Sequence, residues 1–156
     1  NVSSLLGRVI APAYVLYSPT IFALEAMSEA LAYELVPHGI DVTVIEPGGY
    51  PTMIWKNANE NALRLLERAQ DKHLDGYKPL VARLGKRTGG GSTDPMDVPN
   101  AMAEEISMPP GTRPLRRPVH PGLNPQTALN ELAAQIQTDW LGGSAFGPWI
   151  KAVHTT

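Results

Sequence analysis

The order of turn-forming and apolar segments in the first fifty residues most restricts what this chain can fold into. Leu5 to Leu16 has the composition of a loop, and Pro19 suits the first turn of a helix that follows it. Gly39 ends that helix, and an apolar strand over residues 41–46 stops at Pro47-Gly48-Gly49. A loop, a helix, a loop and a strand in this order are typical of a parallel sheet covered by helices. The sequence therefore predicts an α/β fold with parallel strands and flanking helices.

The first long helix has two expected faces. One is a buried stripe at helical spacing, made of Leu24, Met27, Leu31 and Leu35. The other is a face of small residues that allows close packing, made of Ala23, Ala26 and Ala30. After residue 49 the sequence predicts helices over about 57–71 and 76–84, followed by a flexible glycine break at 89–91. It then predicts a helix capped by Asp94, an edge strand over 112–119, a helix from Asn124 to about Leu141, and a short packed tail.

Composition excludes several classes of function. The net charge of -2 across 156 residues offers no basic surface for nucleic acid or an anionic membrane. The chain has no cysteine, which excludes disulfides and thiolate chemistry and fits a cytoplasmic, reducing location. The four histidines are scattered without ligand spacing, so we expect no metal site. No apolar run is long enough to span a membrane.

Ser4, Tyr17 and the loop from Pro47 to Thr52 are predicted to share one cleft. In a parallel sheet, strand ends and the starts of the following helices lie on the same side, where ligands bind. A serine hydroxyl and a phenol together can hold and protonate a carbonyl oxygen. Taken alone, the two side chains fit a loop hydroxyl and a half-buried tyrosine better than a catalytic pair.

Four runs of this sequence resemble the classical short-chain dehydrogenases/reductases: residues 1–8 (NVSSLLGR), 17–25 (YSPTIFALE), 29–35 (EALAYEL) and 39–49 (GIDVTVIEPGG). The interval from Ser4 to Tyr17 equals the family's usual serine-to-tyrosine interval, and weaker likeness continues through residues 94–98 and 109–119. The resemblance implies a partial Rossmann-like, doubly wound fold that lacks the N-terminal nucleotide-binding half. It implies one domain over 1–156, with a core catalytic segment at 1–54, a substrate lid at 55–88, and a last helix, edge strand and tail at 89–156.

The resemblance also implies roles for individual residues. Family members interconvert carbonyls and alcohols with NAD or NADP. Ser4 would position the substrate oxygen, and Tyr17 would act as general acid or base. The implied cofactor contacts are Pro47, Gly48, Gly49 and Thr52, and the implied substrate contacts are Tyr50, Met53 and Trp55.

Two departures from the family pattern bear on activity. The motif lysine, four residues after the tyrosine, is replaced by Ile21. Without that ammonium group we expect Tyr17 to stay a neutral phenol that donates a hydrogen bond but is a weak base. A dinucleotide needs a glycine-rich turn between a strand and its helix, and Gly89-Gly90-Gly91 follows no buried strand. We expect that run to be a linker, and this chain alone to be inactive in hydride transfer.

Three functions remain open on the sequence alone. The first is an oxidoreductase of this family, incomplete or impaired in this chain, acting on a small carbonyl or alcohol. The second is a non-catalytic pseudoenzyme or binding protein that resembles the short-chain dehydrogenases/reductases (SDR). The third is a hydrolase that uses Ser4, weakened because no histidine is placed to activate it. A strand ending at Ser4 would also leave an apolar edge, so we expect a homo-oligomer formed through that edge or through the alanine-bearing helix.

Overall fold

The computed structural model describes residues 1–154 and divides them into two compact units. The first unit holds residues 1–48 and those from Met96 onward, and the second holds Gly49–Pro95. The first unit contains η1 (Leu5–Gly7), α1 (Tyr17–Leu35), η2 (Val36–His38), β1 (Val44–Pro47), α5 (Asp97–Ser107), β2 (Arg116–Val119), α6 (Thr127–Leu141) and α7 (Gly147–His154). The second contains α2 (Met53–Arg68), α3 (Asp71–Leu74), η3 (Asp75–Tyr77) and α4 (Lys78–Val81).

The sheet of the first unit is parallel, as the sequence predicts. β1 pairs with β2 in the register Val44 to Arg116 through Pro47 to Val119. Residues 1–3 run parallel along the other edge of β1, because Ser3 N–H donates to the Ile45 carbonyl at 2.8 Å and Ile45 N–H donates to the Asn1 carbonyl at 2.9 Å. β2 therefore lies at the edge of the sheet that the described residues form, in keeping with its prolines.

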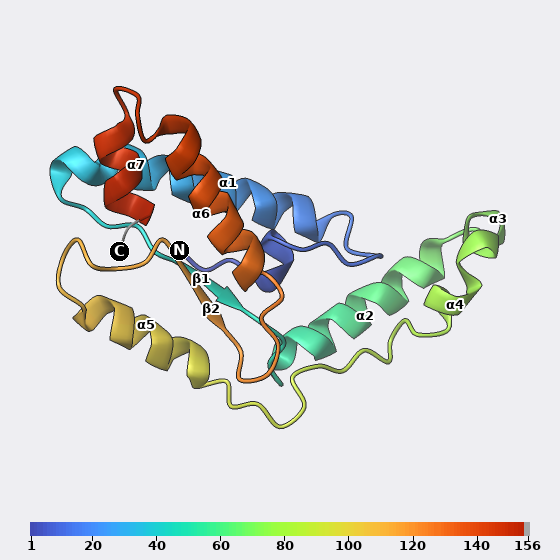
Figure 1. The fold of residues 1–156 in the computed structure, drawn as a ribbon. Helices are drawn as coiled ribbons and strands as arrows, with labels where there is room; N and C mark the ends of the chain where they lie inside the picture. Colours follow the sequence, from blue (N-terminus) through green and yellow to red (C-terminus); the bar gives the residue numbers. More distant parts are fainter. Residues whose placement is uncertain (155–156) are drawn as a thin grey trace. The chain divides into compact units, whose positions relative to one another are not determined.

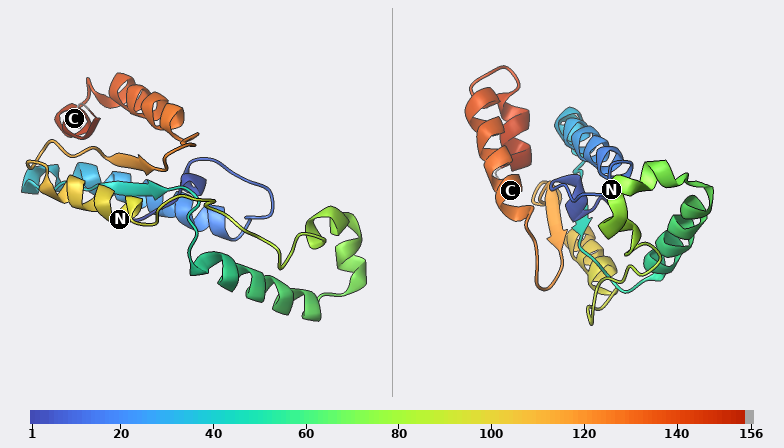
Figure 2. Two further views of the ribbon diagram at one scale, coloured as in Figure 1. Left: turned by 90° about the horizontal axis from the view of Figure 1, so that it is seen from below. Right: turned by 90° about the vertical axis from the view of Figure 1, so that its right-hand side faces the viewer.

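Alternation along β2 sends neighbouring side chains to opposite faces of the sheet. Arg116 faces α1, where it meets Glu25, and Arg117 faces α5, where it meets Glu104. Figure 1 shows α1 and α5 on opposite sides of the two strands. α6 and α7 lie side by side, as both views of Figure 2 show, and α7 also packs on α1. The core between these layers is small, with Val44, Ile45, Leu115 and Ile150 among its buried members.

The predicted buried stripe of α1 is wrong. Met27 and Leu31 are 53% and 37% exposed, and the buried residues of the helix are Ser18, Glu25, Ser28 and Ala32. The inward face is polar because it meets polar partners: Asn1 Nδ2 donates to Ser28 Oγ at 2.8 Å, and Glu25 meets Arg116. Periodicity counts hydrophobic side chains, so it cannot recognise a helix that buries charge.

Four other sequence predictions need correction at the level of boundaries and caps. α2 begins at Met53 rather than near residue 57, and the helix expected over 76–84 is broken into short turns that include α4. Asp94 does not cap α5, which begins at Asp97 with Met96 before it. Asn124 does not cap α6, because its side-chain amide donates to the His120 carbonyl instead. The short packed tail is confirmed as α7.

The outward face of α1 fits the expectation of self-association, which stays a prediction. Its exposed members include Ala23, Ala26, Met27, Ala30 and Leu31. We expect light scattering at tens of micromolar to give a mass above that of one chain, since such a face loses apolar exposure on pairing. A homogeneous monomer at that concentration would contradict the prediction.

Among the described residues, no helix is both long enough and apolar enough to cross a membrane.

Candidate functional site

Ser4 stands at the turn that carries the chain from the sheet edge into η1. Its backbone is extended, and its Oγ accepts a hydrogen bond from Leu6 N–H at 3.2 Å, which makes it the N-cap of η1. The Ser4 carbonyl also accepts from Gly7 N–H at 2.8 Å. The hydroxyl is half-buried and keeps its O–H available for donation, because the capping bond uses only its acceptor side.

Tyr17 is the first residue of α1, which packs against η1. Its side chain is 39% exposed, and its ring lies edge-on to that of Tyr14 with centroids 6.3 Å apart. Ser4 and Tyr17 thus belong to two elements in mutual contact within the first unit. That arrangement keeps the predicted hydroxyl and phenol on one part of the molecule.

Ile21 lies one turn after Tyr17 and is directed at η1. A Cβ added to Gly7 would stand 2.8 Å from Ile21 Cγ2, 2.7 Å from Ser3 Oγ and 3.0 Å from Glu25 Cγ. The residue at the lysine position therefore presents hydrocarbon to the backbone beside Ser4. The tight approach also explains why position 7 requires glycine.

Replacing Gly7 by alanine is expected to lower the free energy of unfolding by about 1–3 kcal/mol, because the added methyl meets three neighbours that have little room to move. Thermal unfolding followed by circular dichroism measures this. Gly143→Ala is the control, since nothing lies within 4 Å of its added Cβ. Equal stability losses in the two variants would show that the close packing of η1 on α1 has no energetic weight.

The end of β1 brings Pro47 and Gly48 beside the end of β2. Gly48 N–H donates to the Val119 carbonyl at 3.0 Å. The His120 ring covers Gly48 so closely that an added Cβ would be 2.7 Å from His120 Cδ2. The same ring accepts hydrogen bonds through Nδ1 from the N–H groups of Gly122 and Leu123, at 3.1 and 2.9 Å. The sequence does not predict that His120 covers Gly48, although a histidine directly after a strand is a usable signal.

The remaining predicted contacts lie in the second unit. Thr52 is the N-cap of α2, with Oγ1 accepting from Ile54 N–H at 3.4 Å, and the Met53 side chain is 60% exposed. Tyr50 is 6% exposed, and its carbonyl accepts from the Trp55 indole N–H at 2.7 Å. These bonds give Tyr50 and Trp55 structural partners within the unit. Their roles in binding substrate, with those of Gly49, Thr52 and Met53, stay predictions.

The glycine run at 89–91 is not a simple flexible break. A Cβ on Gly89 would fall 2.0 Å from Trp55 Cζ2, so the indole rests directly on that backbone. Gly90 has φ +86°, and its added Cβ would be 2.3 Å from Pro51 N. Among the described residues the run comes directly after no strand. Gly89 and Gly90 allow close packing inside the second unit, and Gly91, with φ +52°, has open space where a Cβ would stand.

A buried charge network lies against the inner face of α1. Arg116, 5% exposed at the side chain, donates to Glu25 at 2.9 Å and to Glu29 at 2.6 Å, and its Nε lies 3.6 Å from Glu46 Oε1. The side chains of Glu25 and Glu46 are 2% and 0% exposed. The sequence predicts only an edge strand here, and nothing in it indicates that the Arg116 side chain is buried. Its β2 position faces α1, and only alternation in the observed register reveals that.

A second branch of the network links the segments that carry the predicted site. Asn130 of α6 accepts from Arg8 Nε at 2.8 Å and donates to Glu46 Oε2 at 2.8 Å. Arg8 closes the turn after η1, and Glu46 immediately precedes Pro47. α6 therefore ties the loop that follows Ser4 to the strand that ends at the glycine loop.

Burial shifts the protonation of several members. Burial and repulsion from Glu25 raise the pKa of Glu46 to about 7. Burial alone would raise the pKa of Glu29, but hydrogen bonds from Tyr33 and Arg116 lower it overall. Burial lowers the pKa of His154, which makes a hydrogen bond with the Tyr33 hydroxyl at 2.6 Å. Glu46 is therefore about half protonated near pH 7, while the lowered pKa of His154 favours its neutral form there.

The residues of the first unit do not fit the nicotinamide end of a dinucleotide well. Where the family has an ammonium group, Ile21 offers a methyl group packed on Gly7, and the Gly48 backbone is covered by imidazole. No group of three or more His, Cys, Asp or Glu side chains among the described residues could hold a metal ion.

Comparison with known proteins decides the family. Residues 1–63 match the short chain dehydrogenase family. The chain is also 32% identical over 123 residues to the uncharacterized oxidoreductase YusZ of Bacillus subtilis, aligned over 79% of this chain and 43% of that protein. This chain belongs to the short-chain dehydrogenase family.

Other members of the family give the same relationship. The mitochondrial D-beta-hydroxybutyrate dehydrogenase of Rattus norvegicus is 33% identical over 116 residues, which cover 69% of this chain and 34% of that enzyme. The crystal structure of a short-chain dehydrogenase from Streptomyces avermitilis matches with a TM-score of 0.55 at 24% identity, over 90% of this chain and 48% of the other. The chain thus spans less than half the length of these relatives, and the solved structure supports the partial Rossmann-like α/β fold.

Proposed function

We propose that the first unit binds the oxygen of a small carbonyl or alcohol between Ser4 and Tyr17, and that this polypeptide alone does not transfer hydride from NAD(P). The packing of η1 on α1 carries the proposal, because it keeps both side chains on adjacent elements. Ser4 Oγ retains a donor, and the Tyr17 phenol supplies a second, so together they can polarise a carbonyl oxygen. Its substrate would be one that an oxidoreductase of the short-chain dehydrogenase/reductase family acts on. The protein would work in the cytoplasm as a homo-oligomer.

The second candidate is a binding protein that keeps the cleft without catalysis. Ile21 favours it, since the position that would hold the cofactor ribose in the family carries a side chain without a donor. A hydrolase that uses Ser4 is the remote third candidate, and release of acid from an ester would support it.

A cofactor titration tests the impaired activity. We expect no saturable binding of NADH or NADPH below about 1 mM, measured by the fluorescence of the reduced nicotinamide. Saturable binding in the micromolar range would contradict the proposed impairment and favour a competent oxidoreductase.

Ile21→Lys alone is expected to produce no NAD(P)-dependent turnover, because one ammonium group does not supply a pyrophosphate cradle. Ile21→Met is the control for the change in side-chain shape. Absorbance at 340 nm with a panel of aldehydes, ketones and alcohols measures the outcome. NAD(P)-dependent turnover that appears in Ile21→Lys and not in Ile21→Met would refute the claim that the dinucleotide site is absent.

A further inference from the structure

A second concave site lies at the amino ends of the strands. Residues 41–42 lead into β1 and Leu115 leads into β2, and these segments line a cavity of about 470 Å³ together with α1, η2 and α7. The volume falls in the range of small-molecule sites. Ser4 and Gly48 lie at the opposite, carboxyl ends of the strands, so this cavity is separate from the proposed oxidoreductase site.

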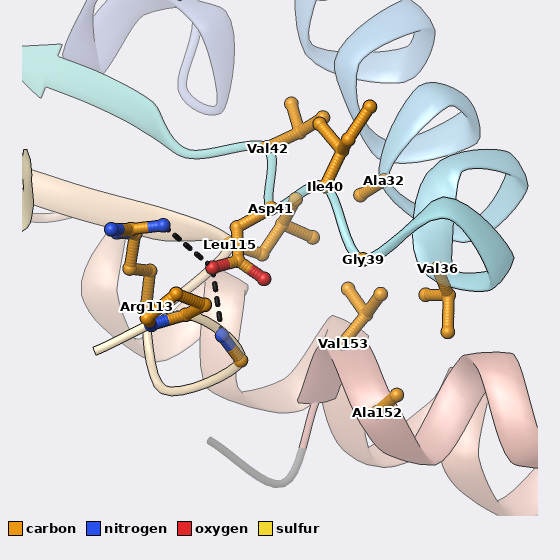
Figure 3. Close-up of a pocket in the computed structure, with 12 residues that line it drawn as sticks. Ala32, Val36, Gly39, Ile40, Asp41, Val42, Arg113, Leu115, Ala152 and Val153 are labelled. Atoms are coloured by element: carbon orange, nitrogen blue, oxygen red, sulfur yellow. Dashed lines mark hydrogen bonds and ion pairs between the residues drawn. The ribbon is translucent and has the colours of Figure 1, made fainter. Parts of the chain in front are cut away.

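The cavity has an apolar wall and one carboxylate. Val36, Val42, Leu115 and Val153 supply hydrocarbon from four different segments. Figure 3 shows these side chains around the space, with Asp41 at its edge. A mixed lining of this kind suits a ligand with an apolar body and a single polar group.

Asp41 uses only one of its two oxygens within the described part of the chain. Its Oδ2 accepts from Arg113 Nη1 at 2.9 Å and from Gly111 N–H at 2.8 Å. Oδ1 accepts from no donor among residues 1–154, and Figure 3 shows the second oxygen turned into the pocket. A carboxylate oxygen beside hydrocarbon attracts an N–H or O–H donor, and most strongly a charged one.

Arg113 also lines the cavity, and its guanidinium is engaged by Asp41 Oδ2 and by backbone carbonyls. Besides Asp41, its guanidinium donates to the carbonyls of Glu105, Ile106 and Met108 at 2.8–3.2 Å, around the end of α5. α1 ends at its C-cap Val36 and α7 ends at His154, next to Val153, so the carbonyl ends of these two helices border the cavity and contribute partial negative charge.

Other basic groups in the neighbourhood do not line the cavity. His154 is bonded to Tyr33, and the Lys151 stem extends toward Gly142, where Cε would be 3.5 Å from an added Cβ. His38, at the end of η2, is likewise absent from the lining. Within the described lining, the second Asp41 oxygen and the carbonyl ends of α1 and α7 are acceptors, and they favour a ligand that carries a charged N–H donor.

We propose that this cavity binds a small organic amine, whose ammonium group donates to the second Asp41 oxygen while its hydrocarbon part lies against Val36, Val42 and Leu115. The proposal is independent of the oxidoreductase function, since no residue is shared between the two sites. A primary amine on an aryl or alkyl chain matches both the carboxylate and the apolar wall.

The test uses the whole chain and 2-phenylethylamine, with 2-phenylethanol as the uncharged analogue of the same shape. We expect saturable calorimetric binding of the amine with a Kd of the order of 1 mM, the scale for a ligand of about nine non-hydrogen atoms. The alcohol should bind at least about fivefold more weakly, because it lacks the charge-assisted bond.

Variants separate the carboxylate from the cavity. Asp41→Asn keeps an acceptor for Arg113 and Gly111 but removes the charge, and it should weaken amine binding about tenfold. Ala152→Leu changes an exposed lining residue and should fill the space and abolish binding. Asp139→Asn on α6 is the control and should bind as the parent does, with circular dichroism confirming that every variant is folded.

Three results would overturn the proposal. One is the absence of saturable binding by the parent chain. Another is equal affinity for the amine and the alcohol, and the third is undiminished amine binding in Asp41→Asn or Ala152→Leu. None of these results changes the outcome expected from the NAD(P)H titration. Failure of the amine proposal would therefore leave the proposed function untouched, and the titration tests that function separately.

Discussion

Replacing Arg116 by methionine is expected to lower the free energy of unfolding by about 3–5 kcal/mol, the scale for breaking a buried ion pair from one side. The guanidinium is the cation that directly contacts Glu25 and Glu29, and it also lies near Glu46. Methionine fills much of the same volume but leaves buried carboxylates without that partner. Denaturant unfolding followed by far-UV circular dichroism measures the loss.

Arg117→Met is the matched control, because it makes the same chemical change at the next residue of the same strand. Arg117 is 43% exposed at the side chain. It bonds Glu104, which is 65% exposed, and its Nε lies 3.7 Å from Oε1 of Glu105, which is 6% exposed. The exposed pair contributes about 0–1 kcal/mol and the contact with Glu105 is longer than the bonds of Arg116, so the control should lose clearly less stability than Arg116→Met. Similar losses in the two variants would contradict the view that the network on the α1 side of the sheet holds the first unit together.

Glu46→Gln is expected to remove a pH dependence of stability. The pKa of Glu46 is about 7 in the folded chain, against an ordinary value near 4.5. Between these two values the folded state keeps a proton that the unfolded state has lost, so stability falls as pH rises. The decrease amounts to about 3 kcal/mol, is complete above pH 7, and is absent below pH 4.5.

Comparison of the two proteins at each pH isolates this contribution. His154 acts in the opposite direction below pH 6.5, because its lowered pKa leaves the unfolded state with more protons. Glu29, whose pKa is lowered, matters only below its ordinary value of 4.5. The difference in unfolding free energy between Glu46→Gln and the parent should therefore grow in favour of the variant from pH 5 to pH 8. Glu131→Gln, an exposed change on α6, should show no such trend, and a flat difference for Glu46→Gln would contradict the assignment.

The candidate site was predicted from local signals, and its role stays a prediction. The Ser4 and Tyr17 pair, the Ile21 replacement and the Pro47–Gly49 break all lie in one contiguous stretch of sequence, where spacing carries the information. The structure adds that Ser4 caps η1 and that Ile21 packs on Gly7. His120 escaped notice because it reaches Gly48 only through the pairing of β1 with β2.

The order of elements was set locally and could be read from the chain. Gly39 adopts the left-handed conformation that ends η2 after α1, with φ 64°, and the apolar run after it forms β1. Such signals depend on the backbone preferences of a few neighbouring residues, so they can be recognised without knowledge of the fold.

The sequence by itself determined the α/β order of elements, the end of β1 at Pro47, and the isoleucine at the position of the family's lysine. Only the tertiary structure decided which faces are buried. Glu25, Glu46 and Arg116 look like surface charges in the sequence. They are buried because α1, β1 and β2 bring them together, so that ion pairs with Arg116 replace contacts of the two carboxylates with water. The cavity beside Asp41 arises in the same way, from segments far apart in the chain whose neighbours are fixed only by packing.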